Sequence, residues 1–279
     1  MNSISLPRPV LPQSGLPRSG LPQPRLSLPA PARRAAFGKV LLNEARLTWR
    51  LPVGIIGGVG IPMVLLIIFG SLPKFHKTMP GLGGLTLFDL YVPVIMVLGL
   101  AALALWGLPG PLVSYREQGI LRRLSTTPVP PSWLLAAQAA VQTCIAVAGL
   151  VLVVGTSMIA FGAPAPKSPA GLVLSCGLAI AGLFPMGLLI ASVARTPNAA
   201  SVIGRLAFFP LMFFAGLWLP RALMPGVLLD VSNYTPLGAA VQAIQDSMLS
   251  GFPPAAPLLV LAAYALVLGF AARRCFRWE

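Results

Sequence analysis

The chain has 279 residues, of which 56% are hydrophobic and only 9% are charged. A soluble domain carries about 25% charged residues, so this composition cannot cover a water-facing surface and excludes an ordinary soluble protein. It also excludes an intrinsically disordered chain, because so much apolar side chain would collapse. The lipid bilayer is the solvent that tolerates such a composition, and we predict a membrane protein.

The charge balance is strongly basic, with 20 Lys and Arg residues against 6 Asp and Glu residues. Most of the basic residues lie at the ends of apolar runs, which is typical of membrane proteins that carry positive charge on their cytoplasmic loops. We therefore expect no nucleic-acid partner. The three cysteines, Cys144, Cys176 and Cys275, lie far apart and fit neither a disulfide framework nor a metal site.

The chain begins with a proline-rich segment, residues 1–32, whose prolines prevent a helix. We predict that this segment is a disordered cytoplasmic tail. Residues 33–50 follow a helical pattern, with their basic side chains mostly away from one less polar face. That face carries Phe37, Leu41, Ala45 and Thr48. We predict an amphipathic helix lying in the membrane interface.

Residues 51–279 contain six apolar runs, each long enough to cross a bilayer core of about 30 Å as a helix. The middle of each run lacks charged residues, and a charge there would cost about 2.5–3.5 kcal/mol. The predicted spans are Val53–Leu72, Leu90–Val113, Trp133–Phe161, Leu172–Ala194, Val202–Leu219 and Ala255–Ala272. The predicted fold class is therefore all-α, a polytopic membrane protein with six transmembrane helices.

Between the fifth and sixth runs lies a stretch, Pro220–Pro254, that is moderately apolar and carries Asp230 and Asp246. Its prolines make it too broken for two further spans. We predict short external helices that re-enter the outer leaflet partway, where surrounding protein shields their backbone.

Lysine and arginine positions predict the orientation of the spans. One side carries Arg33, Arg34, Lys39, Arg46, Arg50, Arg116, Arg122, Arg123, Arg195, Arg205, Arg273, Arg274 and Arg277. The other side carries Lys74, Lys77, Lys167 and Arg221. We predict that the first side, with both termini, is cytoplasmic.

The sequence offers little for catalysis. It has no glycine-rich phosphate loop of the G-x-x-x-x-G-K-[ST] type, so the chain is not expected to hydrolyse ATP by that route. His76 is the single histidine, which leaves no His-based metal pair or Ser-His dyad. We assign no catalytic residue, no metal and no cofactor to this chain. Any uphill transport would draw its energy from a cytoplasmic partner.

The best candidate for such a contact is the loop after the second span. Tyr115 to Thr126 is long enough for about three helical turns, and Thr127-Pro128 would end that helix. One interpretation is an interfacial loop helix with positive-inside arginines. The other is a docking helix whose charged residues pair with a partner; these are Arg116, Glu117, Arg122 and Arg123.

Two motifs resemble a known family. Glu117-x-Gly119-x-Leu121-Arg122-x-Leu124-x-x-Thr127-Pro128 resembles the cytoplasmic coupling segment of ABC-2 type transporter permeases. Phe214–Pro220, Leu223–Pro225 and Asn233–Leu237 resemble the segment that joins the fifth span to the external helices in that family. The resemblance covers about residues 33–279, in register with six spans.

The resemblance implies the permease subunit of a bacterial ABC exporter of the daunorubicin-resistance type, located in the plasma membrane. It implies separate ABC ATPase subunits that bind ATP, a second copy or a homologous permease, contact with membrane lipids, and a hydrophobic or amphipathic small-molecule substrate such as a drug or antibiotic. The implied coupling residues are Tyr115, Arg116, Glu117, Gly119, Leu121, Arg122, Leu124, Thr127 and Pro128.

In this family the second and fifth spans line the dimer seam, which suggests a substrate path. Helical spacing places Arg205, Phe209, Met212 and Gly216 on one face, with Phe213 alongside. Flexible Met and large aromatic side chains suit adaptable apolar binding, whereas simple packing against helices or lipid is the alternative.

Two other functions are left open by the sequence. A permease that exports a lipid-linked glycan or a lipid would share the architecture, although an aromatic content of 8% mildly disfavours a glycan path. A membrane scaffold that transports nothing would need no ATPase partner.

Overall fold

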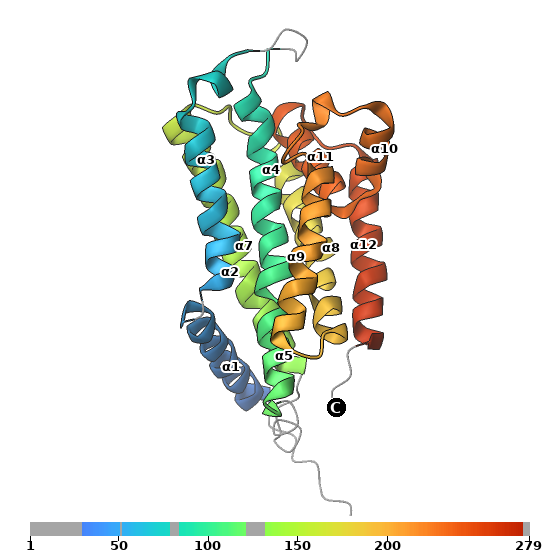
Figure 1. Ribbon diagram of the computed structural model, residues 1–279. Helices are drawn as coiled ribbons and strands as arrows, with labels where there is room; N and C mark the ends of the chain where they lie inside the picture. Colours follow the sequence, from blue (N-terminus) through green and yellow to red (C-terminus); the bar gives the residue numbers. More distant parts are fainter. Residues whose placement is uncertain (1–29, 51, 79–83, 121–131, 276–279) are drawn as a thin grey trace, which may run out of the picture.

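The computed structural model describes residues 30–50, 52–78, 84–120 and 132–275 (Figure 1). These residues are mostly helical and contain no β-strand, although Thr78 and Thr86 form an isolated bridge. The elements are α1 (Ala30–Arg50), α2 (Val53–Ile55), η1 (Ile56–Gly60), α3 (Ile61–Ser71), η2 (Pro73–His76), α4 (Leu87–Ala102), η3 (Leu103–Gly107), α5 (Pro109–Glu117), α7 (Ser132–Phe161), α8 (Pro169–Val193), α9 (Pro197–Ala215), η4 (Arg221–Leu223), α10 (Gly226–Tyr234), α11 (Pro236–Leu249) and α12 (Ala255–Cys275).

Within the described ranges, six helical segments are long and apolar enough to cross a membrane. They are Val53–Ser71, Leu87–Glu117, Trp133–Phe161, Pro169–Val193, Pro197–Ala215 and Ala255–Arg274. The prediction of an all-α membrane protein with six spans is confirmed. The proline-rich tail predicted at residues 1–32 lies almost wholly outside the described residues, and α1 begins at Ala30.

Three spans begin earlier than their apolar runs because polar residues cap them. Thr86 and Asp89 form a capping box at the start of α4, in which the Asp89 amide donates to Thr86 Oγ1 at 3.2 Å and the Thr86 amide donates to Asp89 Oδ2 at 3.0 Å. Ser168 and Thr196 accept the corresponding amide bonds at the starts of α8 and α9, and a proline follows each cap.

The fifth span also ends earlier than predicted. Helix α9 stops at Ala215, and Gly216 follows in the left-handed region with φ +94°. A glycine in this conformation closes a helix without steric cost. The predicted extension of this span to Leu219 is therefore wrong, since the chain turns toward η4 at Gly216.

The bundle has two distinct ends (Figure 1). Helix α1, the C-terminal ends of α5 and α12, and the short connection from α8 to α9 lie at one end, which we call the basic end. Helices α10 and α11 and the 3₁₀ turn η2 lie at the opposite end, which we call the outer end. Short helices thus stand where Pro220–Pro254 was predicted to contain them. Their depth in the bilayer stays a prediction.

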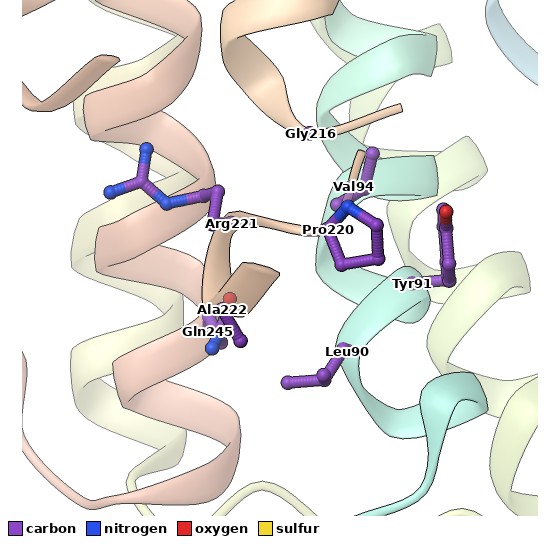
Figure 2. A pocket seen from close by; sticks show the side chains of 8 residues that line it. All are labelled: Leu90, Tyr91, Val94, Gly216, Pro220, Arg221, Ala222 and Gln245. Atoms are coloured by element: carbon purple, nitrogen blue, oxygen red, sulfur yellow. The ribbon is translucent and has the colours of Figure 1, made fainter. Parts of the chain in front are cut away.

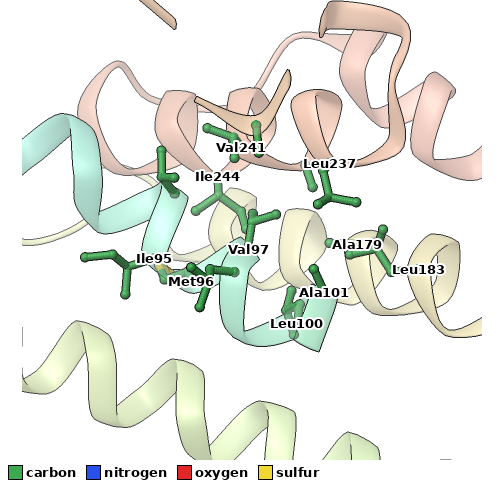
Figure 3. Close-up of a cluster of buried hydrophobic side chains, with 14 of the residues drawn as sticks. Ile95, Met96, Val97, Leu100, Ala101, Ala179, Leu183, Leu237, Val241 and Ile244 are labelled. Atoms are coloured by element: carbon green, nitrogen blue, oxygen red, sulfur yellow. The ribbon is translucent and has the colours of Figure 1, made fainter. Parts of the chain in front are cut away.

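Span two is the centre of the fold. In its most apolar window 89% of the residues are buried, against 17–33% for the other five candidate spans. Figure 3 shows α4 side chains packing against α8 and α11. The cluster includes Ile95, Met96, Val97, Leu100, Ala101, Ala179, Leu183, Leu237, Val241 and Ile244. The faces left exposed on the peripheral spans are apolar, as lipid or a second membrane subunit requires.

Spans one and two each contain one π-helical segment just before a proline. Segment η1 precedes Pro62 and segment η3 precedes Pro109. Proline has no N–H, and its ring clashes with the carbonyl four residues back, so a wider turn relieves the clash. In η3 the Leu108 amide donates to the Leu103 carbonyl at 3.0 Å, five residues back.

As a result, two buried carbonyls of span two lack the backbone amide, four residues further along, that donates to a carbonyl in a regular α-helix. The Ala104 carbonyl loses the Leu108 amide, and the Leu105 carbonyl faces Pro109, which has no amide hydrogen. Gly187 of α8 and Gly204 of α9 lie directly against these two oxygens, where any Cβ would overlap them. Spans two, four and five therefore meet backbone to backbone, a packing that small residues permit in membranes.

We predict that Gly187→Ala destabilises the chain by about 1–3 kcal/mol, because its methyl group would overlap the Ala104 carbonyl oxygen. Gly177 lies on the same helix, and a methyl group added to its Cα would have no neighbour within 4 Å, so Gly177→Ala is the matched control. Thermal unfolding in detergent, followed by circular dichroism, measures both. Equal melting temperatures for the two variants would contradict the close contact.

Candidate functional site

The candidate coupling region follows the last turn of α5. This helix continues span two to Glu117, after which Gly119 adopts φ +67°. A helix running without a break from Tyr115 to Thr126 is therefore ruled out, because the left-handed Gly119 interrupts it. Tyr115, Arg116 and Glu117 belong to the end of span two. The remaining predicted coupling residues, Leu121, Arg122, Leu124, Thr127 and Pro128, lie outside the described residues.

Tyr115 joins span two to helix α1. Its hydroxyl donates to the Glu44 carboxylate, at 3.0 Å from Oε1 and 2.9 Å from Oε2. Glu44 is only 2% exposed although α1 lies at the edge of the bundle. Burial raises the pKa of the Glu44 carboxyl, and the Tyr115 hydrogen bond lowers it in part. The pair is thus a charge-assisted link between two segments far apart in sequence.

The less polar face predicted for helix α1 included Ala45 and left out Glu44. The structure leaves Ala45 exposed and buries Glu44. The positions Phe37, Leu41, Glu44 and Thr48 follow spacings of four, three and four, which is the helical repeat of a single face. That spacing could have identified Glu44, but an acidic residue was not expected among inward-facing positions. The basic residues predicted to lie away from this face, Lys39, Arg46 and Arg50, are exposed.

Arg116 points back into its own protein. Its guanidinium donates to the carbonyls of Ala191 at 3.4 Å and Ser192 at 3.5 Å, and also to that of Ala194. These carbonyls belong to the C-terminal end of α8, where unpaired acceptors and the helix dipole favour a cation. The expectation that Arg116 pairs with a partner protein is therefore revised, since its donors serve α8.

Glu117 is the predicted coupling residue that the described structure leaves available. Its side chain is exposed at the end of α5, and Gln118 beside it is exposed as well. Both follow directly after the anchors Tyr115 and Arg116 in the chain. The end of span two is therefore fixed to α1 and α8, and Glu117 and Gln118 are exposed beside these contacts.

A second polar cluster organises the outer end. Arg221 is 9% exposed and donates to Ser232 Oγ, to Asn233 Oδ1 at 2.6 Å and to Gln242 Oε1 at 3.5 Å. It thereby ties the turn after α9 to α10 and α11. Burial lowers the pKa of Arg221 to about 10, an effect that the charge of Asp246 opposes. Burial also raises the pKa of Asp246, while Arg221 lowers it.

The hollow beside Arg221 is too small for a substrate. It lies between α4 and the turn after α9, and its volume is about 10 Å³. Figure 2 shows Leu90 and Tyr91 of α4 on one side, and the Arg221 guanidinium turned away from them. We assign this cluster a structural role. In the described part of the chain, no group of three or more His, Cys, Asp or Glu residues could hold a metal ion.

The model of one protein family, the ABC-2 type transporter, matches residues 36–249. The chain belongs to the ABC-2 type transporter family. It is thus the membrane permease of an ABC transporter, a class of subunit that works with separate ABC ATPases. The match begins in α1 and ends at the last residue of α11. No curated protein matches the sequence.

The residues predicted for a substrate path in this ABC-2 permease do not share one face. Phe209 and Phe213 are 57% and 37% exposed on α9, whereas Met212 is fully buried. Gly216 closes the helix and is buried. Met212 belongs with Gly204, Phe208 and Ala215 on the packed face, because the helix turns by about 100° per residue. The two phenylalanines and Arg205, which the prediction placed on the same face, keep a place on an outward surface.

We predict that Tyr115→Phe destabilises the permease by about 1–3 kcal/mol, because the buried Glu44 carboxylate loses its donor. The loss should grow as the pH rises through the raised pKa of Glu44. The lost bond favours the charged form of Glu44, which is present above the raised pKa and absent below it. Melting temperature in detergent against pH measures this. Tyr234, 73% exposed, provides the control Tyr234→Phe, which should leave the profile unchanged.

We also predict that Arg221→Lys loosens the outer end. Lysine keeps the charge but lacks the planar fork that reaches Ser232 and Asn233 together. Hydrogen exchange in α10 should rise about tenfold, as expected for the loss of one such bond. The exposed Arg205 offers the control Arg205→Lys. Unchanged protection of α10 in Arg221→Lys would argue against the clamp.

Proposed function

We propose that this chain is the permease of a bacterial plasma-membrane exporter for amphipathic small molecules, of the daunorubicin-resistance type. ATP would be hydrolysed by separate ABC ATPase subunits, and two permease halves, identical or homologous, would form the membrane unit. The observation that carries this proposal is the anchoring of span two by Tyr115 and Arg116. It connects the end of α5, where the proposed coupling residues begin, to α1 and α8.

The distribution of charge supports an inward-facing basic end. Described cations on the elements at that end are Lys39, Arg46, Arg50, Arg116, Arg195, Arg205, Arg273 and Arg274. Those on elements at the outer end are Lys74, Lys77, Lys167 and Arg221. Cytoplasmic loops carry the excess of Lys and Arg, so we place the basic end, and with it both termini, in the cytoplasm.

A cytoplasmic basic end gives the ATPase a surface to act on. Along the chain, Glu117 is followed by the proposed coupling residues Leu121, Arg122, Leu124, Thr127 and Pro128, which would contact the ATPase. A push on these residues reaches α5 directly, and through Tyr115 and Arg116 it reaches α1 and α8. Because α5 continues η3 and α4, the same displacement is delivered to the most buried span.

The outward face of α9 suits contact with a second permease, lipid or substrate. Phe209 and Phe213 stand on it with Leu206 and Val202, all exposed in the single chain. Trp218 continues this surface, its ring centroid 6.3 Å from that of Phe209. Large aromatic side chains contribute most to apolar recognition per residue. We assign Phe209 and Phe213 to the substrate path at the seam between the two halves.

We predict that Glu117→Ala lowers ATP-driven transport about tenfold, because the exposed carboxylate would contact the ATPase. The assay uses the permease reconstituted with its partner ABC ATPase and follows uptake of a fluorescent amphiphile into inverted vesicles. Asp230→Asn is the matched control, since Asp230 is an exposed carboxylate at the outer end.

Normal transport by Glu117→Ala would contradict the proposed coupling contact. Purification of the permease without any ATPase under mild detergent would contradict the transporter assembly. Accumulation of an undecaprenyl-linked glycan in a deletion strain, with unchanged drug sensitivity, would replace the small molecule with a glycan as cargo.

A further inference from the structure

A large cavity, partly open to the surface, lies at the basic end of one protomer. Its volume is about 540 Å³, and α1, η3, α5, α7 and α9 all contribute to its wall. Pockets for drug-sized ligands measure about 300–1,000 Å³, so the cavity can hold an amphiphile of that size. Phe209 and Phe213, which we assign to the seam between permease halves, do not line it. The cavity is therefore separate from the proposed path on α9.

Several buried polar atoms in the cavity wall have no hydrogen-bond partner among the described residues. Gln138 of α7 is 1% exposed, and neither its Oε1 nor its Nε2 is paired. Gln142, one turn further on, is equally buried and leaves its Oε1 unpaired, while its Nε2 donates to the Gly107 carbonyl at 3.3 Å. Trp106 leaves its indole N–H unpaired. All three residues line the same cavity.

This number of unpaired polar groups in one wall is unusual for a folded protein. Buried polar atoms are nearly always satisfied in folded proteins, and exceptions mark a functional site or a missing partner. The side chains that carry these two unpaired donors and two unpaired acceptors all line one largely apolar cavity. Small side-chain rotations would turn the unpaired atoms toward a ligand that carries both donors and acceptors on an apolar body.

The charged residues that line the cavity indicate the charge of the ligand. Glu44 lines the cavity, and the lining residues that the structure describes include no Lys, Arg or His. The Glu44 carboxylate, the Gln138 Oε1 and the Gln142 Oε1 are acceptors, and an ammonium group is a donor with three N–H bonds. An anionic head would meet the carboxylate with like charge, whereas a cationic one would compensate the buried charge.

We propose that this cavity is a binding site for an amphiphilic amine, with its ammonium group at Glu44 and further polar groups at Trp106, Gln138 and Gln142. The proposal rests on the proposed function for the amphipathic nature of the cargo and adds the chemical class. The cavity also touches Gly54 beside η1 and Gly107 within η3. A bound amine would therefore contact both π-helical spans, which places the ligand against the elements that the coupling segment moves.

The test uses the full chain in nanodiscs of phosphatidylcholine, without ATPase or ATP. The probe is a dodecylamine with a photoreactive diazirine in its alkyl chain, and the comparison is the matching dodecanol. Mass spectrometry locates the labelled peptides. We expect the amine to label the α5 and α7 segments that line the cavity and the alcohol to label them about tenfold less, as one charged hydrogen bond would give.

Two variants test the assigned contacts. Glu44→Gln keeps the size of the side chain and an acceptor for Tyr115 but removes the charge, and Gln138→Leu removes both unpaired amide atoms. Each should reduce amine labelling about tenfold. Gln138→Leu should also raise the melting temperature, because a binding function, and not stability, accounts for an unpaired buried amide. The controls are Asp230→Asn and Gln245→Leu, both on helices near the outer end.

Competition experiments decide whether the bound amine is a lipid headgroup or a soluble small molecule. If phosphatidylethanolamine in the nanodisc suppresses labelling, the amine is an aminolipid headgroup; if only a soluble amphiphilic amine competes, it is a small molecule. Equal labelling by amine and alcohol, or wild-type labelling of Glu44→Gln and Gln138→Leu, would overturn the proposal. Either result leaves the ATPase coupling test at Glu117 unaffected. Failure of the amine site can therefore be distinguished from failure of the proposed coupling function.

Discussion

Two backbone carbonyl oxygens at the centre of span two constrain the whole bundle. Neither oxygen keeps its usual helical donor, because the Leu108 amide donates to Leu103 and Pro109 has no N–H. Gly187 and Gly204 bring spans four and five directly onto these oxygens. The most buried span is thus held between two others at a place where its own helix is locally widened. A widened turn is also where a helix can most readily change its hydrogen bonds.

The basic end is organised around the same span. Below the π-helical segment, α5 is tied to α1 through Tyr115 and Glu44 and to α8 through Arg116. Each bond crosses between segments more than 70 residues apart in sequence. Force applied beyond Glu117 would therefore be shared among three elements. The proposed amine cavity lies within this group of helices, so ligand binding and the proposed coupling movement would act on the same contacts.

The outer end is held together by the hydrogen bonds of one buried arginine. There Arg221 places one guanidinium between the turn after α9 and the helices α10 and α11, and α11 packs into the apolar cluster around α4. Burial of a charged group is costly unless its hydrogen bonds are made, and Arg221 makes them with neutral partners. The hydrogen-bonded Arg221 cluster contrasts with the cavity at the basic end, where polar groups are buried and left unpaired.

The sequence by itself determined the number of spans, their approximate limits, and the family, because a bilayer demands long uncharged runs and the ABC-2 motifs are local. It did not determine the capped beginnings at Thr86, Ser168 and Thr196, since the span prediction followed apolarity alone. Only the tertiary structure decided that Glu44 faces inward, that Arg116 serves α8 and that Met212 is buried. Those outcomes depend on which residues pack together across the bundle. Helical periodicity predicts which residues share a face, but it does not predict which helix that face contacts.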